Sequence, residues 1–163
     1  MGVCGSGKST VGAALARHLD ATFLEGDQFH PPDNVARMAA GIALNDSDRQ
    51  GWLHSLGERL GAAKRNNEAV VLSCSALKRS YRDTLRRQAG DLALVYLAGT
   101  PELLAQRMAG RSGHYMPPSL LASQLATLEP PQDDEHALTL DIALAPEALL
   151  HQTLAWLSRS HAG

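Results

Sequence analysis

The sequence of 163 residues lacks the features that several classes of protein require. It has only two cysteines, Cys4 and Cys74, and neither shows the spacing of a zinc site. A net charge of -2 provides no global positive field for nucleic acid or an anionic membrane. No apolar run approaches the roughly 18 residues of a membrane span, and no basic stretch with an apolar core indicates a signal peptide. The composition therefore predicts one globular domain in the reducing cytoplasm, with any anion site confined to a local region.

Short apolar runs alternate with helical patterns along the chain, which is typical of βα units around a mostly parallel sheet. Asp46 or Ser47 is expected to cap the third helix, and Thr100 the fifth. Ligands of such sheets bind beyond the carboxyl ends of the strands, so function is expected there. The predicted helices are 8–19, 31–40, 46–65, 78–89, 100–110, 119–128 and 146–158, and the predicted strands are 21–25, 69–74, 92–97 and 138–144.

A glycine-rich segment at the start of the chain fits the phosphate-binding pattern G-x-x-x-x-G-K-[ST]. Its glycines let backbone N–H groups turn toward a polyphosphate, and the helix that begins at Lys8 directs its positive end to the same place. We expect Lys8 to bridge the β- and γ-phosphates of ATP and Ser9 to supply a hydroxyl to Mg²⁺. The predicted nucleotide-binding residues are Gly2, Val3, Cys4, Gly5, Ser6, Gly7, Lys8, Ser9 and Thr10.

Two acidic residues follow the predicted strand 21–25, where a parallel sheet would bring them beside the phosphates. Glu25 is expected to help hold Mg²⁺, directly or through water. Asp27 is expected to hold or deprotonate an acceptor hydroxyl. The alternative for Asp27 is that it only caps a turn.

Four further segments, 26–31, 44–49, 74–78 and 113–116, together resemble the gluconokinase family of ATP-dependent gluconate kinases. The resemblance implies a three-layer α/β P-loop kinase fold, similar to shikimate and adenylate kinases, with a parallel sheet of nominally five strands. It also implies a helical substrate insert at about 30–65 and a lid at about 107–128. The implied reaction is phosphorylation of D-gluconate at its 6-hydroxyl, giving 6-phospho-D-gluconate and ADP, and some family members are homodimers.

An acyclic sugar acid presents a carboxylate and a row of hydroxyls, so its pocket needs both cations and hydrogen-bond acceptors. Asp27 is predicted to orient or deprotonate the 6-hydroxyl, with His30 as the second candidate for the base. Arg111 of the lid is predicted to stabilise the transferring phosphoryl group. The predicted substrate contacts are Asp27, His30, Asn34, Arg49, Lys78, Arg82 and His114.

In this fold the phosphate loop follows a buried first strand, but only Met1 precedes Gly2 here. We therefore expect that strand to be largely absent from this chain and Met1 to be an internal methionine of a longer natural sequence. Adenine is expected to contact the segment around 143–146. Two alternative functions remain open: a P-loop kinase for shikimate, adenylylsulfate or a nucleoside, and a nucleotide-binding protein with impaired catalysis.

Overall fold

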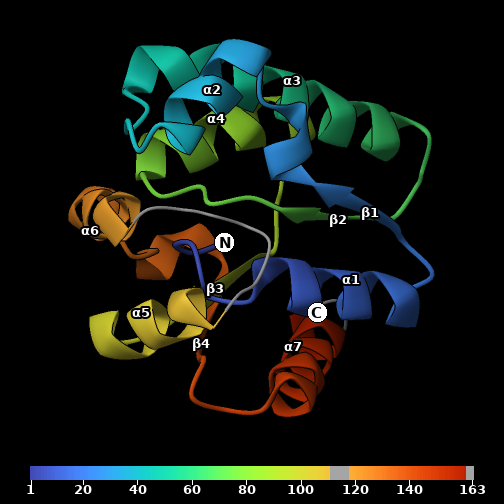
Figure 1. Ribbon diagram of the computed structural model, residues 1–163. Coiled ribbons are helices and arrows are strands. Elements are labelled where there is room, and N and C mark those ends of the chain that lie inside the picture. The colour runs from blue at the N-terminus through green and yellow to red at the C-terminus, as the bar shows by residue number, and fades with distance from the viewer. Residues whose placement is uncertain (111–117, 161–163) are drawn as a thin grey trace.

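Parallel strands form the middle layer of the molecule in the computed structural model, which describes residues 1–110 and 118–160 (Figure 1). Strand β1 (Thr22–Glu25) pairs with β2 (Val70–Ser73), and β3 (Leu94–Ala98) pairs with β4 (Ala137–Asp141). Both pairs are parallel, which confirms the α/β architecture predicted from the alternation of apolar runs and helices.

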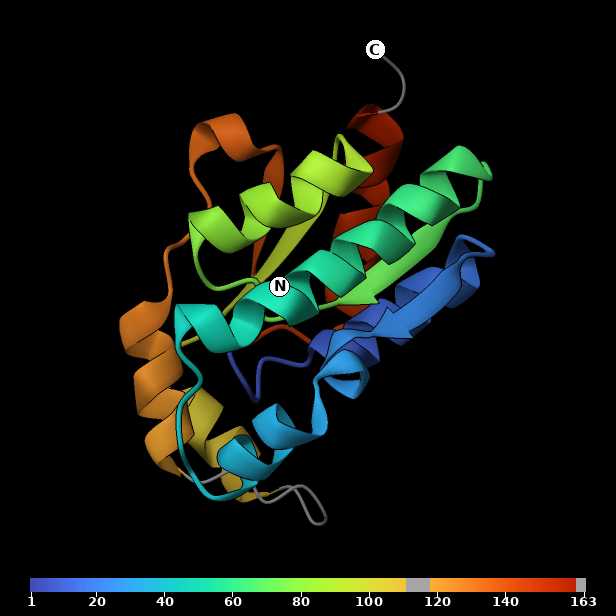
Figure 2. The same cartoon turned by 90° about the horizontal axis from the view of Figure 1, so that it is seen from above.

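Helices cover both faces of the strands, as the sequence predicted. Above them in Figure 1 lie α2 (Pro32–Ala39), α3 (Asp46–Arg65) and α4 (Arg79–Ala89), and below them lie α1 (Lys8–His18) and α7 (Pro146–Ser160). Helices α5 (Pro101–Ala109) and α6 (Pro118–Thr127) lie with α2 near the end toward which β1 and β2 point, in both ribbon views (Figures 1 and 2). This end is the carboxyl edge of the strands, where a site is expected.

Local hydrogen bonds explain where some elements begin and end. Helix α3 is capped by Asn45 rather than by Asp46 or Ser47, because the Asn45 side chain accepts from the backbone N–H of Asp48 while the Asp48 carboxylate accepts from that of Asn45. Thr100 caps α5 as predicted. Strand β4 ends at Asp141, short of the predicted residue 144, because the Asp141 carboxylate accepts from the N–H of Ala143 and turns the chain.

The described residues contain four strands in two pairs, one strand fewer than the nominal five-stranded sheet whose first strand was expected to be largely absent from this chain. The start of the chain connects the two pairs. The Met1 nitrogen donates to the Val95 carbonyl and the Leu97 N–H donates to the Met1 carbonyl, while the Gly2 N–H donates to the carbonyl of Ser75. The phosphate loop is thus fixed at its origin to β3 on one side and to the segment after β2 on the other.

Two apolar clusters stabilise the layers. One surrounds Leu104 and Ile142 beneath β3 and β4, and the other surrounds Trp52 and Leu56 between α3, α4 and β2. Leu56 and Ile142 are fully buried, and burying such a side chain contributes about 1.5–3 kcal/mol. Within the described ranges, no helix combines the length and the apolar character needed to cross a membrane.

Candidate active site

The phosphate loop occupies the turn between Met1 and α1 and depends on its glycines. Gly5 and Gly7 have φ of 79° and 91°, in the left-handed region where a side chain is strained. At Gly2 an added Cβ would lie 2.8 Å from the Leu97 carbonyl oxygen, so the loop could not approach β3 with a larger residue there. The sequence pattern therefore corresponds to a backbone that only glycine permits.

The N-terminus of α1 is equipped to bind an anion. Gly7 provides no capping side chain, and the first turn of the helix contains no acidic residue, so its positive end is not neutralised locally. The Ser6 hydroxyl is buried and has no hydrogen-bond partner among the residues that the structure describes. Unused donors at a helix N-terminus are the groups that bind phosphate oxygens.

Lys8 lies inside this loop, and its ammonium donates to the Val3 carbonyl at 2.9 Å. Burial holds the pKa of Lys8 below its ordinary value, and the negative charges of Asp27 and Glu25 partly offset this effect. The two predicted acids are thus close enough to Lys8 to influence its charge.

Asp27 lies in a 3-10 turn, Gly26–Phe29, directly after β1. The turn passes so close to β2 that a Cβ at Gly26 would meet the Ser73 carbonyl oxygen at 2.4 Å. Gly26 therefore lets the chain cross the edge of β2 and leaves the Asp27 side chain exposed beside the loop. Asp27 therefore presents an exposed carboxylate at the carboxyl end of β1, and its negative charge favours the charged form of Lys8.

His30 follows this turn and is 8% exposed. Burial lowers the pKa of its imidazole, while the Asp27 carboxylate raises it and Arg49 lowers it further. His30 Nδ1 has no partner within the described residues. The ring is therefore neutral near pH 7 and retains a nitrogen for hydrogen bonding.

Two other predicted contacts hold the connection between α2 and α3. The Asn34 amide donates to the Asp48 carbonyl at 2.7 Å and is 7% exposed. Arg49 is 8% exposed, donates to the Leu44 carbonyl at 3.4 Å, and lies with its guanidinium 5.8 Å from the ring centre of Tyr81. Both side chains are buried and engaged within the protein, and neither lines the two cavities described below.

Arg82 does not reach the site. Its side chain is fully buried and makes a two-pronged ion pair with Glu135, with both contacts at 2.7 Å. Its remaining nitrogen donates to the carbonyls of Ala76, Leu77 and Glu129. The guanidinium is engaged by the protein itself, so its position does not support the substrate contact expected from the sequence.

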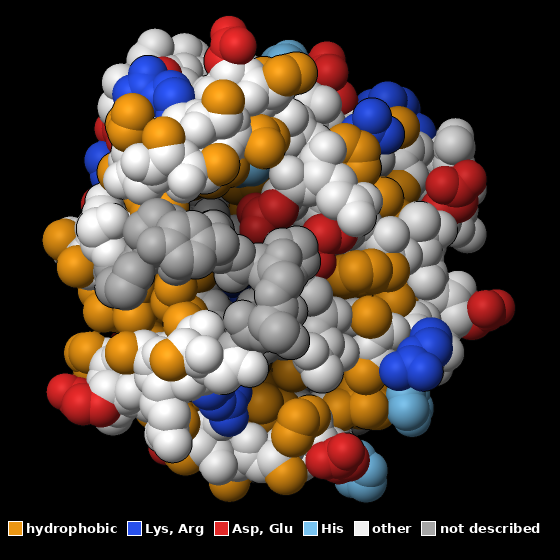
Figure 3. Space-filling model, in the orientation of Figure 1, with side chains coloured by type: hydrophobic (Ala, Val, Ile, Leu, Met, Phe, Trp, Pro, Cys, Tyr) orange, Lys and Arg blue, Asp and Glu red, His pale blue; other side chains and the backbone are white. Residues whose placement is uncertain are grey.

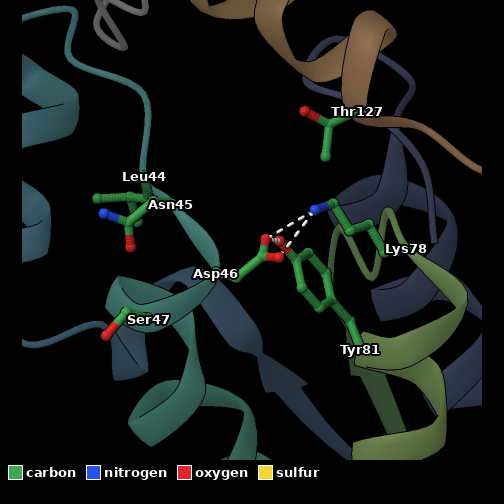
Figure 4. A pocket seen from close by; sticks show the side chains of 7 residues that line it. All are labelled: Leu44, Asn45, Asp46, Ser47, Lys78, Tyr81 and Thr127. Carbon is green, nitrogen blue, oxygen red and sulfur yellow. Dashed lines mark hydrogen bonds and ion pairs between the residues drawn. The ribbon is translucent and has the colours of Figure 1, made fainter.

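Lys78 directly precedes α4, and its side chain lines a cavity of about 510 Å³ (Figure 4). Its ammonium donates to both oxygens of Asp46 at 2.8 and 2.9 Å, and the Tyr81 hydroxyl donates to the same carboxylate. Asp46 and Tyr81 were not predicted as site residues. The cavity is lined by Leu44, Asn45, Asp46, Ser47, Lys78, Tyr81 and Thr127.

A second cavity, of about 210 Å³, lies against the phosphate loop. Leu144 and Pro146 line it opposite Gly5 and Gly7, and Leu144 is 39% exposed. Arg107 contributes to the same wall and donates to the Ile142 carbonyl. The segment expected to contact adenine thus presents apolar surface beside the loop.

The phosphate loop is also tied to α6, which the sequence did not predict. The Cys4 N–H donates to the Gln124 side-chain oxygen at 2.7 Å, and the Cys4 sulfur lies 3.3 Å from that of Met108.

The predicted lid residues Arg111 and His114 lie outside the described residues. Figure 3 shows acidic side chains gathered at a hollow between the upper and lower helices.

Ser9 and Glu25 offer the oxygen ligands that Mg²⁺ prefers. Ser9 is exposed in the first turn of α1, and Glu25 ends β1, where its negative charge acts on Lys8. In the described ranges no group of three or more His, Cys, Asp or Glu residues could hold a metal ion by itself. This donor set fits Mg²⁺, which usually keeps several waters and binds one or two protein ligands together with substrate phosphates.

Comparisons with known proteins agree with this geometry. The AAA domain family matches residues 1–131. A thermoresistant gluconokinase of Escherichia coli is 41% identical over 155 residues, which are 94% of this chain and 89% of that protein. The unliganded crystal structure of a sugar kinase from Janibacter sp. HTCC2649 superposes with a TM-score of 0.94 at 45% identity, covering 97% of this chain and 91% of the other. A gluconokinase structure from Sinorhizobium meliloti 1021 gives a TM-score of 0.89 at 49% identity, covering 98% and 89%.

Proposed function

This chain belongs to the gluconokinase family, and we propose that it transfers the γ-phosphoryl group of ATP to the 6-hydroxyl of D-gluconate. The proposal is supported by the position of Asp27 in the turn directly after β1, which crosses the end of β2 at Ser73, and by the effect of its charge on Lys8 of the phosphate loop. A carboxylate at that position can hold an acceptor hydroxyl in line with the phosphate that the loop binds.

Each part of the site has a role in this reaction. The backbone of the phosphate loop and Lys8 bind the phosphates, and adenine enters the cavity beside Leu144 and Pro146. Mg²⁺, held through Ser9 and Glu25, would offset the charge of the β- and γ-phosphates. Lys78 faces the cavity of about 510 Å³ and supplies a cation for the carboxylate of the sugar acid.

Phosphoryl transfer then depends on positioning and charge stabilisation. The 6-oxygen attacks the γ-phosphorus, and the bond from that phosphorus to the β–γ bridging oxygen breaks. The hydroxyl proton passes to Asp27, and ADP leaves. Arg111 and His114, outside the described residues, are proposed to contact the phosphoryl group and the substrate from the lid. Neither Cys4 nor Cys74 is part of a disulfide, which supports a reducing compartment, the cytoplasm, as the location of the protein.

The test is a coupled assay of ADP production with ATP, Mg²⁺ and a panel of acceptors. D-gluconate is expected to support turnover, with shikimate, adenylylsulfate and nucleosides at background. Phosphorus NMR of the product should show a phosphate monoester on carbon 6. Turnover with another acceptor alone would assign the chain to a different small-molecule kinase. ATP binding without turnover on any acceptor would indicate a nucleotide-binding protein.

A further inference from the structure

Asp46 is not needed to cap its own helix. It follows the cap residue Asn45, which forms the reciprocal cap with Asp48. Its carboxylate instead reaches to the start of α4, where it accepts from Lys78 and Tyr81, residues 32 and 35 positions further along the chain. Figure 4 shows the three side chains converging at one side of the cavity.

This contact contributes little to stability, because the Asp46 side chain is 66% exposed. Exposed ion pairs contribute about 0–1 kcal/mol, so holding the fold together does not explain the arrangement. The hydrogen bonds from Lys78 and Tyr81 lower the pKa of Asp46, and the carboxylate is therefore ionised at neutral pH. An ionised carboxylate with most of its surface open still has free lone pairs that face the cavity.

Charged groups of both signs lie around Tyr81. The Arg49 guanidinium and the Lys78 ammonium lie 5.8 and 5.7 Å from the centre of the Tyr81 ring. Asp46 pairs directly with one of these two cations, Lys78, and the charge of the Glu129 carboxylate also acts on Tyr81. The Lys78 ammonium has three N–H donors, and its two contacts with Asp46 leave at least one for another anion.

We propose that Asp46 is a substrate-specificity residue, which directs the Lys78 ammonium toward the carboxylate of a sugar acid and accepts a hydroxyl of the same molecule. The inference rests on the proposed function, since it assigns the end of the substrate remote from the transferred phosphate to this cavity. Tyr81 fixes the Asp46 carboxylate by donating to it. The cavity then recognises a carboxylate and a hydroxyl together, which is the chemistry of an aldonic acid.

The test is equilibrium binding of D-gluconate without ATP, measured by calorimetry. Asp46→Asn is expected to weaken binding at least tenfold, and Tyr81→Phe about threefold. Asp134→Asn is the matched control, because Asp134 also pairs at 2.7 Å with a cation at the start of α4, Arg79, but does not line the cavity. The control is expected to bind gluconate within twofold of the wild type, and all variants should bind ATP alike.

A double-mutant cycle sharpens the result. The part of the Asp46 effect that acts through Lys78 is absent in Lys78→Met, so adding Asp46→Asn to that variant should weaken binding by a smaller factor than it does in the wild type. Gluconate binding by Asp46→Asn within twofold of the wild type, or tighter than it, would overturn the inference. The same cycle on Asp134 and Arg79 should show no effect on gluconate.

The same binding measurements distinguish a failure of the proposed function from a failure of the inference about Asp46. If the wild type binds another sugar acid from a panel but not gluconate, the assignment of gluconate is wrong, and the comparison of Asp46→Asn with Asp134→Asn on that acid decides the inference. If the wild type binds no sugar acid at all, the role of Asp46 and the proposed function are both rejected.

Discussion

The imidazole of His30 stacks on the indole of Trp52, with ring centres 4.0 Å apart and an angle of 17° between the planes. The same indole donates from Nε1 to the Gly26 carbonyl at 2.8 Å. Trp52 therefore contacts the residues on both sides of the turn that contains Asp27. Helix α3, through this one side chain, fixes the orientation of the acceptor side of the site.

Trp52→Phe should keep a ring beneath His30 but leave the Gly26 carbonyl without its donor. An unpaired buried carbonyl costs about 1–3 kcal/mol, so the free energy of unfolding in urea should fall by that amount. We expect kcat to fall about tenfold because the Asp27 turn is less well held, with little change in KM for ATP. A kcat equal to that of the wild type would show that Trp52 has only a packing role.

Asp27→Asn should abolish proton acceptance while keeping the shape of the side chain. General base catalysis contributes about 10²–10⁴-fold, so kcat should fall by that factor while KM for ATP changes little. Asp33→Asn is a suitable control, because Asp33 is also exposed but belongs to the first turn of α2. If kcat of the two variants were the same, Asp27 would be no more than a turn residue.

Lys8→Met should abolish the binding of ATP without lowering the stability of the fold. The lowered pKa of Lys8 means that folding disfavours its charge, so a neutral side chain of similar length should leave the melting temperature unchanged or raise it. ATP, however, should no longer raise the melting temperature. Lys64→Met, on the exposed last turn of α3, should retain the full ATP-induced rise. A marked loss of stability in Lys8→Met would contradict this account.

The buried ion pair of Arg82 and Glu135 predicts how the free energy of unfolding depends on pH. The hydrogen bond from Arg82 lowers the pKa of Glu135 to about 2 from an ordinary value of 4.5. The folded state binds a proton at Glu135 less readily than the unfolded chain does. The contribution of the ion pair to the free energy of unfolding is therefore fully present above about pH 4.5 and is lost as the pH falls toward 2. It amounts to about 3 kcal/mol from the pKa difference.

Urea unfolding between pH 6 and pH 2.5 measures this contribution. Glu135→Gln should be about 3–5 kcal/mol less stable at pH 6, because Arg82 is left buried without its partner. The variant should also lose less stability than the wild type as the solution is acidified. Parallel stability curves for the two proteins would contradict the prediction.

Local patterns in the sequence were sufficient to predict most of the fold. Apolar spacing located the helices, and the glycine pattern located the phosphate loop, because both depend on neighbours within a few residues. Thr100 was recognised as a cap for the same reason. Asn45 was missed in favour of Asp46 and Ser47, since all three residue types are good caps and only the geometry distinguishes them.

The parts of the site that depend on distant partners could not be predicted in this way. Arg82 looked like a free cation on a basic helix, but its partner Glu135 lies 53 residues further along the chain. Asp46 looked like a capping residue, and its contact with Lys78 spans 32 residues. A single sequence carries no signal for such pairs, because each residue alone fits an ordinary local role.

The hydrogen bonds of the first two residues make the position of the phosphate loop depend on both strand pairs. Met1 is bonded to β3 and Gly2 to Ser75 beyond β2, so the start of the loop bridges two pairs of strands that, within the described residues, are not paired with each other. The position of the loop is therefore set by both strand pairs at once, and a substitution that shifts either pair is expected to weaken the binding of a polyphosphate.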